Sequence, residues 1–224
     1  MPTIFISGGT GYIGTRLINI LLKKNADVLA LVRKGSESKL PAGTNSVVAD
    51  PFLSDSFASR IPRGSIFVQL LGVSHPGPKK KELFRTIDLA SAKASANAAK
   101  KAGVAHFVYV SVAQTPTKIM KDYQACRAEG EAYIESTGLS ATFIRPWYVV
   151  GPGHYWPLLF SPIFKLLELF PATAKKARSL RLVSLSQMLQ TLVFAIEHPV
   201  DGTRIFEISE IKNINAGDSS ALAD

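Results

Sequence analysis

The sequence has almost no cysteine. Its 224 residues include one, Cys126, which excludes a disulfide framework within the chain. A chain without disulfides fits a reducing compartment, and we therefore expect a cytoplasmic protein. No apolar run approaches the roughly 18 residues that a membrane-spanning helix requires. The N-terminus lacks a basic region followed by an apolar core and a small-residue cleavage site, so we expect no signal peptide.

The sequence also lacks a metal-ligand pattern. His106, His154 and His198 share no metal-ligand spacing, so we expect no metal site. His75 follows the fourth expected strand, at the edge of a parallel sheet where ligands bind. It either contacts a substrate or is an ordinary loop histidine.

Acidic residues are too few to balance the basic ones. Lys and Arg number 26 against 17 Asp and Glu, which gives a net charge of +9. Such an excess favours anionic partners, including phosphorylated cofactors, nucleic acid and anionic lipid surfaces. The basic residues are dispersed, however, and neither an RNA-reading aromatic signature nor a helix-turn-helix accompanies them. We therefore expect no nucleic-acid partner, and a solvated basic surface is the plainer interpretation.

Short apolar runs alternate with longer segments of helical period. Continuous apolar strands between helices predict a parallel sheet that is covered on both faces. We expect strands at 3–7, 27–32, 46–49, 65–71, 105–111 and 140–145 and helices at 12–24, 82–102 and 120–137. Right-handed crossovers then give an α/β fold, a doubly wound parallel sheet.

Residues 1–224 are expected to form a single domain. The alternation lapses at 153–183, an apolar and then basic stretch that we expect to be a small C-terminal substrate-side segment. A helix at 186–197 and a strand at 203–208 then return to the sheet, and 212–224 is expected to be a loose tail.

The segment "ISGGTGYIG" at 6–14 follows the first strand and opens a helix. A helix N-terminus presents free N–H groups and a partial positive charge, to which a pyrophosphate binds where no Cβ blocks it. Gly9, Gly11 and Gly14 fit the spacing G-x-G-x-x-G. Gly8, Gly11 and Gly14 fit the alternative spacing G-x-x-G-x-x-G. Both spacings predict a dinucleotide cofactor, and the alternative is a tight turn without a ligand.

The residues after the second strand indicate which dinucleotide binds. Proteins that bind NAD offer an acidic residue there to the ribose hydroxyls, whereas this chain has Arg33 and Lys34. A guanidinium can bind a ribose 2′-phosphate through two parallel hydrogen bonds, so NADP(H) is favoured over NAD(H). The alternative is that Arg33 is only a solvated residue at a strand end. Asp50, after the third strand, is placed to accept a hydrogen bond from the adenine amino group.

These residues resemble the short-chain dehydrogenase/reductase superfamily in its extended and atypical branches, which include epimerase/dehydratase-like and NmrA-like proteins. The resemblance rests on "SGGTGYIG" at 7–14, "QLLGV" at 69–73, the segment 87–112 and "RPWYVVGPG" at 145–153, and it covers roughly residues 3 to 208. It implies a Rossmann fold. It also implies cofactor contacts at Gly8, Thr10, Gly11, Tyr12, Ile13, Gly14, Leu71, Gly72 and Pro146. On this comparison Gly9 is the glycine expected to tolerate alanine.

The resemblance further implies a catalytic Ser, Tyr and Lys. Ser111 matches the Ser and Tyr123 the Tyr, but Arg127 stands where the family has Lys. The implied roles are Tyr123 as acid or base, Ser111 as the residue that orients the substrate oxygen, and Arg127 as a cation that lowers the Tyr123 pKa. Asp88 in place of the family's Asn is a second departure.

The leading hypothesis is an atypical NADP(H)-dependent oxidoreductase that acts on a small carbonyl or quinone-like substrate. The competing hypothesis is a non-catalytic NADP(H)-binding sensor or assembly protein, which the missing Lys favours. A sugar-nucleotide epimerase or dehydratase is a third. Segment 153–183 has three possible roles of its own: it forms an apolar substrate pocket, it makes a weak contact with a membrane surface, or it is part of the core with a solvated face. The chain is expected to be a monomer or a homodimer.

Overall fold

The computed structural model describes residues 2–117, 120–155 and 181–214. Seven parallel strands form its central sheet in the order β3-β2-β1-β4-β5-β6-β9. The strands are β1 (Ile4–Ser7), β2 (Val28–Val32), β3 (Asn45–Val48), β4 (Ile66–Gln69), β5 (His106–Val110), β6 (Ala141–Ile144) and β9 (Thr203–Phe206). The predicted doubly wound parallel fold is confirmed.

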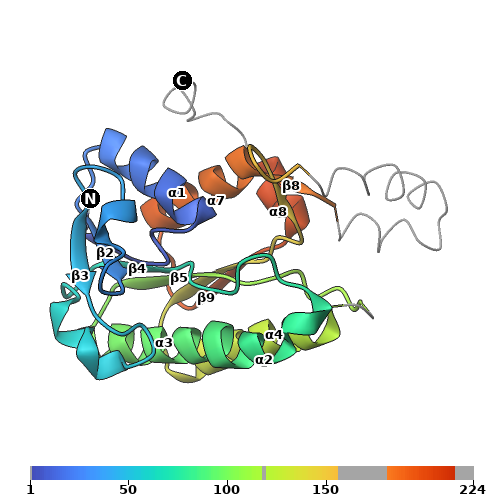
Figure 1. Cartoon of the computed structure of the whole chain (residues 1–224), viewed down its shortest axis with the longest axis horizontal. Coiled ribbons are helices and arrows are strands. Elements are labelled where there is room, and N and C mark those ends of the chain that lie inside the picture. Colours follow the sequence, from blue (N-terminus) through green and yellow to red (C-terminus); the bar gives the residue numbers. More distant parts are fainter. Residues whose placement is uncertain (1, 118–119, 156–180, 215–224) are drawn as a thin grey trace.

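Helices cover both faces of the sheet (Figure 1). One face carries α1 (Tyr12–Lys23), α7 (Leu185–Glu197) and α8 (Ile208–Asn213). The other carries α2 (Lys81–Leu83), α3 (Ala90–Ala102) and α4 (Lys121–Ser136). Short 3₁₀ turns lie at η1 (Glu37–Lys39), η2 (Ser54–Ser56), η3 (Ala58–Arg60) and η4 (Pro78–Lys80). β7 (Val149–Val150) and β8 (Val183–Ser184) form a separate parallel pair.

The alternation of side chains along β1 explains the two-sided core. Ile4 and Ile6 are fully buried against α1 and α7, whereas Phe5 lies on the opposite face with Phe67 and Phe107. Successive strand residues point to opposite faces, so a strand that is apolar at every position requires helices on both sides. The buried alanines of α3 meet the phenylalanine face, where their small side chains let the helix approach closely.

The expected helix at 82–102 consists of three parts. Between α2 and α3 the backbone forms a π-helical segment, η5 (Phe84–Leu89), which the helical period did not predict. The end of α3 at Gly103 is as expected, because Gly103 takes a left-handed conformation with φ +69°.

The loose tail was expected to begin at residue 212, but α8 extends to Asn213. Lys212 and Asn213 belong to α8, which a capping box between Glu207 and Glu210 opens and which buries Ile211 completely. Residues 215–224 lie outside the described part of the chain, as do residues 156–180 of the expected substrate-side segment.

Candidate functional site

Two cavities open beside the carboxyl ends of β1 and β4. The strand order reverses between these two strands, which is where open α/β sheets bind their ligands. The Arg33 cavity, of about 520 Å³, includes Arg33, Ser36, Phe52 and Lys80 in its wall. The Ser111 cavity, of about 310 Å³, includes Ser111 and Tyr123. The two cavities share Gly8, Gly11, Leu70, Gly72, Val73 and Ser74.

The glycine loop has the geometry that a pyrophosphate requires. Gly11 is the N-cap residue of α1, has an extended backbone, and lies in the walls of both cavities. As a glycine it has no side chain that could occupy the first N–H groups of the helix. Gly8 has φ +84°, and a Cβ there would lie 2.6 Å from the Leu71 nitrogen. A Cβ on Gly14 would come within 2.8 Å of the Gly9 Cα. Because these glycines have no side chains, the loop can pack closely against the backbone that follows β4. The N–H groups at the start of α1 then remain free for an anion.

Some of the residues that were expected to contact the cofactor line the Arg33 cavity. Arg33, Thr10 and Leu71 lie in its wall. Lys34 and Asp50 are exposed and do not line either cavity within the described residues. The Asp50 carboxylate instead accepts a hydrogen bond from the Phe52 N–H at 2.9 Å, so its expected adenine contact stays a prediction.

Phe52 is a cavity residue that sequence reasoning missed. Its side chain is 39% exposed although it is large and apolar, and it lies at the wall of the Arg33 cavity. An exposed ring at a cavity wall is a surface on which a flat base can stack. Its position shortly after the third strand, two residues beyond Asp50, is the signal that could have identified it.

The Ser111 cavity brings the expected catalytic side chains together. Ser111, Tyr123 and Arg127 all lie in its wall, although they come from the end of β5 and from two turns of α4. The Ser111 Oγ is buried and has no hydrogen-bond partner among the described residues. Such a hydroxyl is available to a ligand in the cavity. The expected cofactor residues Tyr12, Ile13, Gly14 and Pro146 line the same cavity.

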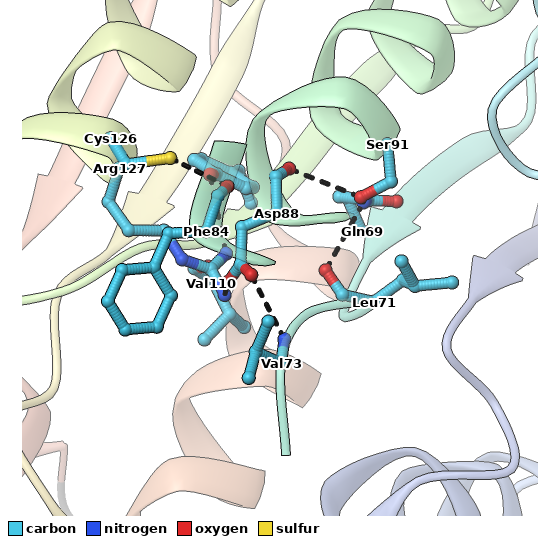
Figure 2. A network of polar contacts seen from close by, with 10 residues as sticks. Gln69, Leu71, Val73, Phe84, Asp88, Ser91, Val110, Cys126 and Arg127 are labelled. Carbon is cyan, nitrogen blue, oxygen red and sulfur yellow. Dashed lines mark hydrogen bonds and ion pairs between the residues drawn. The ribbon is translucent and has the colours of Figure 1, made fainter. Parts of the chain in front are cut away.

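Arg127 is held by a buried ion pair with Asp88 of the π-helical segment (Figure 2). The distance from Arg127 Nη2 to Asp88 Oδ1 is 2.5 Å, and Nη1 donates to the Val110 carbonyl at 2.9 Å. The second Asp88 oxygen accepts from the Val73 N–H at 3.1 Å. The pair fits only beside glycine, because a Cβ on Gly72 would lie 2.9 Å from Asp88 Oδ1. Asp88 and Arg127 thus fix the shared wall of the two cavities.

The environment of Tyr123 differs from the expectation. Burial raises the pKa of Tyr123 above its ordinary value of 10, and the Arg127 guanidinium, 5.3 Å from the ring centroid, offsets this only in part. The Arg127 charge acts in the expected direction, but burial outweighs it, so the Tyr123 pKa is raised. Asp88, which pairs with Arg127, raises the Tyr123 pKa further by a smaller amount, and sequence spacing could not place it there.

Gln124 holds the loop that follows Ser111. Its amide nitrogen donates to the Ala113 carbonyl at 2.6 Å and to the Thr115 carbonyl at 2.7 Å. Its oxygen accepts from the Thr117 N–H at 3.2 Å. One buried side chain of α4 therefore satisfies three backbone groups of the loop, which orders it next to Tyr123.

Two histidines meet at the edge of the Ser111 cavity. His75 and His154 are joined Nε2 to Nε2 at 2.8 Å, and the His154 ring packs edge-on against Tyr12. The left-handed backbone of His75, with φ +51°, accompanies this arrangement. The described residues contain no cluster of three side chains that could hold a metal ion. Nor do they contain a helix of the length and hydropathy that a membrane span needs.

Comparison with known proteins decides the family. The model of the family described as NAD(P)H-binding matches residues 8–151, which include both cavities' glycine loop and Ser111, Tyr123 and Arg127. The chain belongs to this NAD(P)H-binding family. The resemblance to the short-chain dehydrogenase/reductase superfamily is thereby confirmed at the level of family and fold.

Relatives of the NAD(P)H-binding chain are distant. It is 24% identical to UDP-glucose 4-epimerase of Vibrio cholerae, with 97% of this chain and 74% of the relative covered. It is also 24% identical to ceramide reductase of Caulobacter vibrioides, with 93% and 65% covered. The chain thus spans about two thirds to three quarters of these relatives' lengths.

A solved structure shows the same fold with a dinucleotide. The Bordetella bronchiseptica enzyme WbmH in complex with NAD⁺ matches with a TM-score of 0.68 at 20% identity, covering 92% of this chain and 76% of that one. At this identity the likeness establishes the fold of the NAD(P)H-binding chain and nothing finer.

Proposed function

We propose that the chain is an NADP(H)-dependent reductase of the atypical short-chain type, acting on a small carbonyl or quinone-like substrate. The observation that carries this proposal is the Ser111 cavity. An unpartnered Ser111 hydroxyl and Tyr123 share its wall with Gly8 and Gly11 of the dinucleotide loop. A reacting oxygen in this cavity would find both hydroxyls beside the cofactor.

The residues support reduction rather than oxidation. The cofactor, when bound, supplies a hydride to the substrate. Because burial raises the pKa of Tyr123, its hydroxyl stays protonated at neutral pH and can donate a proton to the oxygen that is reduced. Ser111 Oγ can donate a hydrogen bond to the same oxygen. Arg127 cannot lose its proton and is held by Asp88, so it stabilises the site without relaying protons.

The lining of the Ser111 cavity favours an apolar, flat substrate. Val112, Trp147 and Tyr148 contribute apolar and aromatic surface to its wall. The paired imidazole rings of His75 and His154 add polar groups to this otherwise apolar wall. A small carbonyl compound or a quinone combines an apolar body with polar oxygen and suits such a cavity.

Preference for NADP(H) is expected to depend on Arg33. Arg33 lies in the wall of the Arg33 cavity, and a charge-assisted bond to a 2′-phosphate is worth about 1.5–3 kcal/mol, or about tenfold to a hundredfold in affinity. Arg33→Ala should weaken NADPH binding by that factor and leave NADH binding nearly unchanged in fluorescence titrations. Lys34→Ala, an exposed neighbour outside the cavity, is the matched control. Tighter binding of NADH than NADPH by the unaltered chain would refute the preference.

Turnover is expected to depend on the Tyr123 hydroxyl. A positioned proton donor contributes about a hundredfold to ten-thousandfold, so Tyr123→Phe should lower kcat by that range with a panel of carbonyls and quinones. NADPH affinity should change little. Tyr133→Phe removes a hydroxyl that donates to Asn97 outside the cavity and serves as the control. Activity that survives in Tyr123→Phe would show that the assigned role is wrong.

A non-catalytic NADP(H)-binding protein is the second candidate. The Asp88–Arg127 pair favours it, because a fixed guanidinium does not replace a mobile lysine in proton transfer. Tight NADPH binding without turnover of any compound in the panel would support this second function over the first.

A further inference from the structure

The three consecutive lysines at 79–81 have different surroundings. Lys79 is exposed, and Lys81 pairs with Asp122 at 3.2 Å on the surface. Lys80 is half-buried and lies in the wall of the Arg33 cavity. No function described above uses this lysine.

The Lys80 ammonium is held by backbone carbonyls. Its Nζ donates to the Ser74 carbonyl at 2.6 Å and to the His75 carbonyl at 3.0 Å. An ammonium has three protons, so one remains for a ligand in the cavity. Among the described residues no carboxylate pairs with Lys80. The cation is therefore fixed in position while its charge is not neutralised.

Lys80 lines the Arg33 cavity, and its Nζ binds a residue that lines both cavities. Ser74, which binds Nζ, lines both cavities, as do Gly8 and Gly11 of the glycine loop. A dinucleotide that occupies both cavities has its pyrophosphate between its two nucleoside halves. The anionic group of the cofactor would thus lie where the glycine loop and Lys80 both contribute to the wall.

We propose that Lys80 binds the pyrophosphate of the dinucleotide, together with the N-terminus of α1. This inference rests on the proposed dinucleotide function and adds a residue to it. The glycine loop contributes N–H groups from the β1 side, and Lys80 contributes a full positive charge from the segment after β4. Because the same ammonium holds the Ser74 and His75 carbonyls, cofactor phosphates and the loop that shapes the Ser111 cavity are linked through one side chain.

Titrations of the full chain with NADPH and NADH test this inference. Lys80→Ala should weaken both dinucleotides by the same factor, about tenfold to a hundredfold, because both carry the pyrophosphate. Lys80→Gln keeps a donor for the carbonyls but has no charge, and it should weaken both cofactors as well and make their affinity less sensitive to salt. Lys79→Ala is the matched control and should bind both cofactors as the unaltered chain does. Thermal unfolding of each variant checks that it is folded.

Other results of these titrations would contradict either the role of Lys80 or the proposed function. Unchanged affinities in folded Lys80→Ala and Lys80→Gln would overturn the inference and leave the proposed function standing. A loss confined to NADPH would overturn it too, since Lys80 would then bind the 2′-phosphate. If the unaltered chain bound neither dinucleotide, the proposed function would fall first and this inference with it.

Discussion

Replacing Asp88 with alanine is expected to lower the free energy of unfolding by about 3–5 kcal/mol. The Asp88 side chain is fully buried and that of Arg127 is 7% exposed, so the substitution leaves a charged guanidinium buried without its counter-charge. The Val110 carbonyl and the Tyr109 hydroxyl remain as partners, and both are neutral. Denaturant unfolding of the two proteins measures the difference directly.

Two further variants test whether the cost of Asp88→Ala comes from leaving a buried charge unpaired. Asp88→Asn combined with Arg127→Met removes both charges and should cost less than the two single substitutions together, because no unpaired charge remains. Asp55→Ala removes the partner of Lys101 in an exposed pair and should cost at most about 1 kcal/mol. If Asp88→Ala cost no more than Asp55→Ala, the buried pair would not hold the shared wall of the cavities.

Substitutions in the glycine loop are expected to separate folding from cofactor binding. Gly14→Ala places a Cβ against the backbone of Gly8 and Gly9, so the loop or α1 must move, at a cost of about 1–3 kcal/mol. Gly11→Ala meets only the Gly8 carbonyl oxygen, at 3.2 Å, and its backbone conformation suits alanine. We therefore expect Gly11→Ala to fold with nearly unchanged stability.

Binding of the dinucleotide should respond differently. Gly11 lies in both cavity walls, so its new methyl group displaces the phosphates from the helix N–H groups and weakens binding by about tenfold to a hundredfold. Gly9 lines neither cavity, and a Cβ there meets the movable end of Ile18 at 2.9 Å. Gly9→Ala should bind the cofactor normally and serves as the control. Normal NADPH binding by Gly11→Ala would contradict the placement of the phosphates.

The sequence predicted the features that depend on local pattern. Alternating apolar runs placed the strands of the main sheet, because a strand buried on both faces must be apolar throughout. The glycine spacing located the loop after β1, since Gly8 and Gly14 are required by close backbone packing. Ser111 and Tyr123 were expected in one site, and both lie in the wall of one cavity.

Features that depend on tertiary packing were not predictable in the same way. Arg127 lies 39 positions from Asp88, and only the π-helical segment and α4 together bring their charges into contact. Burial of Tyr123, which also depends on packing, raises its pKa by more than Arg127 lowers it. Similarly, composition does not distinguish Lys80 from its two lysine neighbours, because the difference between them lies in the cavity and the carbonyls that Lys80 faces.

A crystal structure of the full chain with NADPH is the most direct test of the central claim that both cavities hold one dinucleotide. We expect the 2′-phosphate at Arg33, the pyrophosphate between Gly11 and Lys80, and the nicotinamide in the Ser111 cavity facing Tyr123. A cofactor bound with its nicotinamide outside the Ser111 cavity, or with its 2′-phosphate away from Arg33, would contradict the proposed reductase.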